Sequence, residues 1–186
     1  MKVSIQRPTW YSDPLTDESL EAIGLLDGVW RDACSNFSAT CNMRLANGKK
    51  APMGIQQFIN NEIDERFQAA GWEGKDAKFR KAETWILISF RHQMSLGSDL
   101  YNALWLWKRG GVKQALLLAG TLDFLKVVTP LDAGSLTSFE RYATAISQMN
   151  GAFNPPIIIG ALEASSKLES SVAELVLGTR LKKTRA

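Results

Sequence analysis

Three short apolar segments constrain the fold of this 186-residue chain more than any other feature. They are WILISF (85–90), KQALLLA (113–119) and IIIGAL (157–162). Each is typical of a strand, and the second is apolar enough to be buried on both faces of a sheet. Because helical patterns separate the three segments, the sequence predicts an α/β fold whose sheet is at least partly parallel.

Apolar residues at helical spacing predict the helices between these strands. The patterns run from Leu20 to Trp30, Ile55 to Phe67, Ser98 to Trp107 and Ser138 to Met149, and a last helix is expected over 163–176. Turn-forming residues predict irregular structure over 31–53 and 120–137. Three strands are few for such a sheet, so weaker strands are expected within 36–54, 73–83 and 120–130.

Length and composition favour a single domain over 1–178, followed by a basic tail over 179–186. The chain is 45% hydrophobic, which is ordinary for a globular protein. No apolar run reaches the roughly 18 residues of a membrane span, and the N-terminal residues lack the apolar core of a secretory signal. Two cysteines are too few for a disulfide scaffold, so a cytoplasmic location and no membrane partner are expected.

Several catalytic motifs are absent from the sequence. It has no GxxxxGK[ST] phosphate loop, no GxGxxG dinucleotide fingerprint, no GxSxG and no HExxH. Its single histidine, His92, follows the first apolar strand, where α/β sheets often carry functional groups. A solvated polar residue at a strand end is the simpler interpretation of His92.

The first apolar strand offers no ligand for a metal ion. Side chains alternate between the faces of a strand, so Trp85, Leu87 and Ser89 share one face. Neither face carries a carboxylate, whereas Mg²⁺ needs hard oxygen ligands. The tryptophans Trp85, Trp105 and Trp107 are expected in the core rather than on a binding surface.

Basic residues gather in three groups, at Lys49–Lys50, Lys75–Lys81 and Arg180–Arg185. The net charge of +3 and the pI near 8.9 mildly favour a polyanionic partner. One interpretation is contact with a nucleic-acid backbone, with bases stacked on Trp10, Tyr11 or Trp72. The other is that these groups are solvated faces of the protein.

The order of elements from 53 to 162 resembles the BglII-type restriction endonucleases of the PD-(D/E)XK superfamily. Three stretches carry this resemblance: GIQQFINNEIDERFQAAGW, WILISFRHQMSLGSDLYNALWLWKRGGVKQALLLAG and SLTSFERYATAISQMNGAFNPPIIIGALE. The resemblance implies a restriction-endonuclease-like mixed sheet flanked by helices. In that family the catalytic strand carries an acid and then an acid or glutamine before a phenylalanine. Here those degenerate positions are Leu87 and Ser89.

The resemblance therefore implies a nuclease fold without its catalytic centre, which binds nucleic acid or a nucleoprotein complex and holds no metal or other cofactor. DNA is the first expectation for the ligand. The contact residues expected are Lys75, Lys78, Arg80, Lys81, Arg91, His92, Lys49 and Lys50.

Two alternatives stay open at this point. One is an active Mg²⁺-dependent DNA endonuclease of a restriction system, which would use Asp76 with Glu83 or Glu65. The other is a protein-interaction module, such as a defence-complex subunit or a phage- or plasmid-encoded inhibitor. Restriction endonucleases commonly form homodimers, so the resemblance also leaves a homodimer open.

Overall fold

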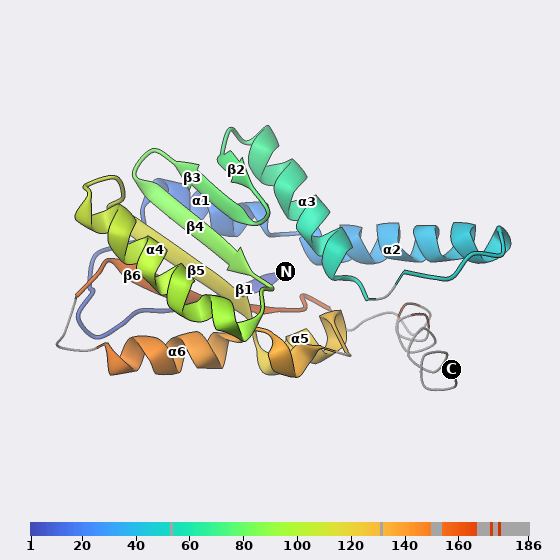
Figure 1. Cartoon of the computed structure of the whole chain (residues 1–186). Coiled ribbons are helices and arrows are strands. Elements are labelled where there is room, and N and C mark those ends of the chain that lie inside the picture. Colours follow the sequence, from blue (N-terminus) through green and yellow to red (C-terminus); the bar gives the residue numbers. More distant parts are fainter. Residues whose placement is uncertain (53, 131, 150–153, 167–171, 173–174, 176–186) are drawn as a thin grey trace.

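The computed structural model describes residues 1–52, 54–130, 132–149, 154–166, 172 and 175. The elements follow in the order β1 (Lys2–Gln6), α1 (Asp17–Leu25), α2 (Val29–Ala46), α3 (Gln56–Ala69), β2 (Glu73–Lys75), β3 (Lys78–Lys81), β4 (Thr84–Ser89), η1 (Gln93–Ser95), α4 (Leu96–Lys108), β5 (Gln114–Gly120), α5 (Leu122–Val128), η2 (Ala133–Ser135), α6 (Phe139–Gln148) and β6 (Ile157–Glu163). Figure 1 shows their arrangement in space.

The strands form one six-stranded sheet in the order β1-β6-β5-β4-β3-β2. The three apolar strands of the sequence are its centre: β4 pairs with β5 and β5 with β6, both in parallel. β1 and the hairpin of β2 and β3 add antiparallel strands at the two sides. The expected α/β fold with a mixed sheet flanked by helices is confirmed.

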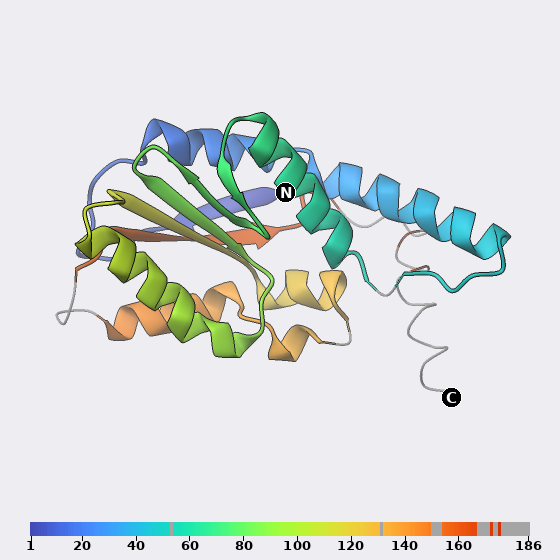
Figure 2. The ribbon, with the colours of Figure 1, turned by 45° about the horizontal axis from the view of Figure 1, so that its top comes forward.

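Helices cover both faces of the sheet, which explains why every residue of β4 and β5 is buried. In Figure 2, α1, α2 and α3 lie above the sheet, and α4 and α6 lie below it. The upper core contains Phe67, Phe79 and Ile86, and the lower core contains Leu87 and Tyr142. A sheet covered on both sides exposes functional side chains only at its edges and strand ends, so a site is expected there.

Two segments expected to be irregular are helices. α2 occupies most of 31–53 because Ala33, Phe37 and Cys41 follow one another at spacings of four and are fully buried. α5 lies within 120–137, where the side chain of Thr121 accepts a hydrogen bond from the Phe124 amide and caps the helix. The weak strands expected in 36–54 and 120–130 were therefore wrong, whereas 73–83 forms β2 and β3.

Other details differ from the expectations or fall outside the described residues. The pattern from Leu20 to Trp30 is divided by Gly28, which adopts a positive φ of 75° between α1 and α2. β1 was missed. Most of the helix expected over 163–176, and the whole tail 179–186, lie outside the described residues. Among the residues that are described, no helix has the length and apolar character needed to cross a membrane.

Candidate functional site

The positions expected to be degenerate lie on the lower face of the sheet, at the carboxyl end of β4. Leu87 is fully buried in the apolar core between the sheet and the helices α4 and α6. Ser89 is also fully buried, and its Oγ accepts a 3.4 Å hydrogen bond from the backbone amide of Arg91. Within the described residues, no three histidine, cysteine, aspartate or glutamate side chains gather in a way that could hold a metal ion. The end of β4 therefore offers no set of anionic ligands.

A single carboxylate does reach this region, and it comes from α4. One oxygen of Asp99 accepts a 2.5 Å hydrogen bond from Arg91 Nη1, and the other accepts a 2.9 Å bond from the Tyr142 hydroxyl. The Asp99 side chain is only 1% exposed. Both oxygens of Asp99 accept hydrogen bonds and the side chain is shielded from solvent. Asp99 therefore holds Arg91 and Tyr142 in place and is not available to a metal ion.

Burial dominates the acid–base properties of this pair. It raises the pKa of Asp99, against the hydrogen bond from Tyr142 and the positive charges of Arg91 and Lys78. Burial also raises the pKa of Tyr142, and the negative charge of Asp99 adds to that effect. Tyr142 therefore stays protonated and donates to Asp99. Sequence could have singled out Asp99, because it is the only acid within the apolar α4 segment.

Three of the expected contact residues share the lower face of the β2–β3 hairpin. Lys75 lies opposite Lys78 in the hairpin register, and Lys78 lies opposite Leu87. Between Lys78 and Arg80, Phe79 points to the upper face, where it stacks on Phe67 at 4.4 Å between ring centroids. Since side chains alternate along a strand, Lys75, Lys78 and Arg80 face the α4 side. We call these three residues the basic row.

The basic row runs alongside α4. Lys78 is close enough to Asp99, in the first turn of α4, to influence the pKa of its carboxyl. At the other end, Arg80 Nη2 donates a 2.5 Å hydrogen bond to the carbonyl oxygen of Gly111, three residues beyond α4. Lys75 and Arg80 are exposed, so the row is open to solvent beside the helix.

The other expected contact residues are not part of the basic row. Lys81 faces the upper side, where its Nζ binds both carboxylate oxygens of Glu21, at 2.8 and 2.9 Å, and the Ala70 carbonyl oxygen. Arg91 pairs with Asp99, although its side chain remains 37% exposed. His92 is exposed and its ring nitrogen accepts a 3.3 Å hydrogen bond from the Met94 amide.

Lys49 and Lys50 lie far from the hairpin. They follow α2 after Asn47 and Gly48, and Figure 1 shows that the far end of α2 extends away from the sheet, on the side opposite to α4 and the strand β3. The Arg44 Nε donates a 2.8 Å hydrogen bond to the Lys50 carbonyl oxygen, which folds this segment back on the helix end. The structure therefore does not bring these two lysines together with Lys75 and Lys78.

The three carboxylates considered for catalysis do not converge either. Asp76 occupies the tight turn between β2 and β3, where it and Ala77 have positive φ angles of 53° and 61°, as a type I′ turn requires. Glu83 precedes the opposite end of β4 and pairs with Lys113 at 2.5 Å. Glu65 is an exposed residue of α3. Asp76 thus has a clear structural role, and the strand β4 separates it from Glu83.

The outer face of α4 carries Trp105, which was expected in the core, and Tyr101. Trp85 is buried as expected and Trp107 is half-buried, but Trp105 is 44% exposed and Tyr101, one turn earlier, is 64% exposed. The Arg109 guanidinium carbon lies 4.5 Å from the centroid of the Trp105 ring. The sequence pattern alone could have placed Tyr101 and Trp105 together, because they are four residues apart on a helix whose opposite face contains Leu100 and Ala103.

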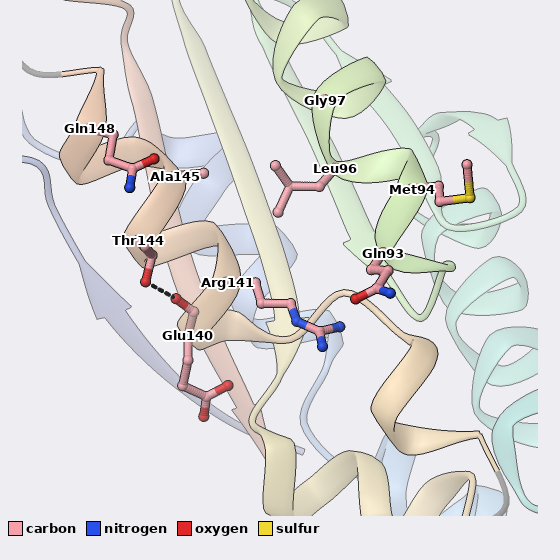
Figure 3. A pocket seen from close by; sticks show the side chains of 9 residues that line it. All are labelled: Gln93, Met94, Leu96, Gly97, Glu140, Arg141, Thr144, Ala145 and Gln148. Atoms are coloured by element: carbon pink, nitrogen blue, oxygen red, sulfur yellow. Dashed lines mark hydrogen bonds between the residues drawn. The ribbon is translucent and has the colours of Figure 1, made fainter.

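An open depression of about 610 Å³ lies between the start of α4 and α6 (Figure 3). Its lining residues are Gln93, Met94, Leu96, Gly97, Glu140, Arg141, Thr144, Ala145 and Gln148. The two charged side chains already bind backbone groups: Arg141 donates to the carbonyls of Leu136 and Gly134, and Glu140 accepts from the Leu122 amide. These hydrogen bonds account for both charged side chains, so no ligand is needed in the depression to pair with them.

Comparison with known proteins adds a limited observation on the fold. No protein-family model matches the chain. No curated protein matches its sequence. A solved structure that is similar is the crystal structure of restriction endonuclease BglII complexed with a DNA 16-mer, with a TM-score of 0.46 and 16% identity. The match covers 55% of this chain and 52% of that chain, so it spans about half the length of each. A likeness at this level says nothing about what this chain binds.

Proposed function

We propose that this protein binds nucleic acid through the basic row of the β2–β3 hairpin and does not cleave it. The observation that carries the proposal is the placement of Lys75 directly opposite Lys78 on an exposed edge hairpin. Like charges at directly opposed positions destabilise a sheet. An anionic ligand bound between the two ammonium groups would attract both and offset their mutual repulsion.

The charges of the two lysines in the basic row are available to a ligand, whereas Arg80 lies opposite Glu73 in the register. Among the described residues, the lysines that form ion pairs are Lys81, Lys113 and Lys126, and Lys75 and Lys78 are not among them. Arg80 uses one terminal nitrogen on the Gly111 carbonyl and is otherwise exposed. Successive cations along an edge suit a ligand with repeated negative charges, and the phosphate backbone of a nucleic acid has that pattern.

The residues on β4 support the proposed absence of cleavage. Leu87 cannot bind a metal ion, and Lys78 places an ammonium group directly opposite it in the register. A cation at this position repels Mg²⁺ rather than attracting it. We infer that the lower face beside Leu87 holds a phosphate group without activating a nucleophile.

Salt dependence of binding tests the proposal. We expect a 20-base-pair duplex and a 20-nucleotide single strand to bind at low salt, with affinities that fall steeply as salt is added. Lys78→Gln should reduce the slope of log affinity against log salt on the duplex by about 0.9, because one phosphate contact is lost. Lys2→Gln is the matched control, since it removes the same charge from the exposed residue Lys2 of β1 at the opposite edge of the sheet. A wild-type protein that binds neither nucleic acid at low salt would refute the proposal.

A further inference from the structure

Two exposed aromatic residues lie on the outer face of α4, and the basic row runs along the same helix. This arrangement has a consequence for the form of the ligand. Tyr101 and Trp105 are four residues apart, so their side chains follow one another on the same helix face with a rise of about 6 Å. Both are far more exposed than the aromatic residues of the two cores, at 64% and 44%. Much of the surface of both rings is therefore open to a ligand.

A cation contacts Trp105, and a second cation lies over the neighbouring Trp107. The Arg109 guanidinium carbon lies 4.5 Å from the centroid of Trp105, and Lys108 Nζ lies 4.6 Å from the centroid of Trp107. The cation–π contact holds the Trp105 indole in one orientation, so a ligand that stacks on it loses less conformational freedom on binding. The last turn of α4 therefore joins a fixed aromatic ring to two positive charges.

We propose that α4 binds unpaired bases, so that the preferred ligand is a single-stranded nucleic acid whose bases stack on Tyr101 and Trp105 while its phosphates meet the basic row. This inference rests on the function proposed above. Lys78 lies within electrostatic range of Asp99 in the first turn of α4, and Arg80 donates to Gly111 beyond its last turn, so the cations of the basic row run along the helix that carries the rings. Stacking on aromatic side chains requires exposed base faces, which a duplex does not offer.

The positive surroundings favour nucleic acid over an apolar protein partner. Lys108 lies in the same turn of α4 as Trp105, Arg109 follows the end of the helix, and both are exposed. An apolar partner surface would have to desolvate these charges without compensation, whereas a phosphate backbone neutralises them. An acidic polypeptide would satisfy the charges but offers no base to stack on the rings.

Binding of three polyanions to the full chain tests the inference: a 20-nucleotide oligo(dT), a 20-base-pair duplex and poly-L-glutamate. We expect the single strand to bind more tightly than the other two. Trp105→Ala should weaken single-strand binding about tenfold, Trp105→Phe should restore most of it, and neither should change duplex binding. Leu122→Ala is the control for loss of an exposed apolar side chain, since Leu122 is 41% exposed on α5.

The outcomes separate this inference from the function on which it rests. Equal or tighter binding of the duplex, or a Trp105→Ala variant that keeps full single-strand affinity with an unchanged circular dichroism spectrum, would overturn the stacking role while leaving nucleic-acid binding in place. Tighter binding of poly-L-glutamate would overturn the choice of ligand. Loss of binding to all three polyanions at low salt would overturn both proposals.

Discussion

The Tyr142 hydroxyl donates a 2.9 Å hydrogen bond to the buried carboxylate of Asp99, and this bond ties α6 to the first turn of α4. Tyr142 is fully buried in the lower core, so the bond has no competition from water. It also determines where Arg91 is held, because the other oxygen of Asp99 accepts from Arg91 Nη1. One buried pair thus positions Arg91, two residues beyond β4.

Replacing this tyrosine should destabilise the protein. Tyr142→Phe keeps the ring but leaves one oxygen of a buried carboxylate without a donor, a loss of about 1–3 kcal/mol in the free energy of unfolding. Urea denaturation measures the effect. Tyr101→Phe is the matched control, since that hydroxyl belongs to a side chain that is 64% exposed, and it should change the free energy by less than about 0.5 kcal/mol. Equal stability of Tyr142→Phe and wild type would contradict the role assigned to the bond.

Asp99 should make stability depend on pH in an unusual direction. Its pKa is raised in the folded protein by burial, so the folded state binds the proton more tightly than the unfolded state does. The contribution of Asp99 is therefore most favourable below its unfolded-state pKa, and it declines as the pH rises through the raised folded-state pKa.

Comparison with Asp99→Asn isolates this contribution from that of the other carboxylates. The stability of the wild type minus that of Asp99→Asn should fall as the pH rises from below the ordinary pKa of an aspartate through the raised pKa of Asp99, and it should then stay level. Thermal or urea unfolding of both proteins across this range provides the measurement. A difference that increases with pH would mean that the pairing with Arg91 outweighs burial.

The opposed lysines of the hairpin should favour binding at the expense of stability. Lys75→Gln or Lys78→Gln removes a like-charge pair and should raise the free energy of unfolding by about 0.2–1 kcal/mol in low salt. The same variants should bind nucleic acid less tightly. Lys126→Gln supplies the contrast, because that lysine pairs with Asp123 and is not expected to repel a neighbour. If Lys75→Gln is destabilising in low salt, the two ammonium groups do not repel each other appreciably.

The hairpin itself depends on Gly74. Its φ is +128°, and a Cβ added there would lie 2.0 Å from the Lys78 carbonyl oxygen, a backbone atom. Gly74→Ala should therefore disrupt the pairing of β2 with β3, at a cost of about 1–3 kcal/mol, and weaken nucleic-acid binding without removing a charge. Gly97→Ala is a suitable control, since nothing lies within 4 Å of that position in α4. Amide hydrogen exchange at Lys75 and Arg80 would report the loss of pairing, and protection as in the wild type would argue against it.

Plasmid DNA should remain intact when it is incubated with the protein and either Mg²⁺ or Mn²⁺. The physical reason is that Asp76 and Glu83 lie at opposite ends of β4 and Asp99 is already bound by two donors. Asp76→Ala and Glu83→Ala should behave like the wild type in this assay. Ion-dependent nicking that disappears in either variant would instead identify a working endonuclease.

The central strands could be predicted from sequence, because a run such as Gln114–Gly120 has to be buried on both faces to avoid exposing apolar surface. α2 could not, since its polar residues obscured the buried positions Phe37 and Cys41. At the site, sequence indicated the cluster from Lys75 to Lys81 but not that Lys81 faces the other side of the sheet. That separation depends on strand register, which becomes visible only once Phe79 is placed against Phe67.

The ammonium group of Lys78 is part of the polypeptide, whereas a metal ion has to be recruited from solution. Its positive charge is therefore present whatever the supply of divalent cations in the cell. Nucleic-acid binding through Lys78 would therefore persist in the presence of chelators such as EDTA. It would require no metal ion to bind after folding, and its strength would depend on ionic strength alone.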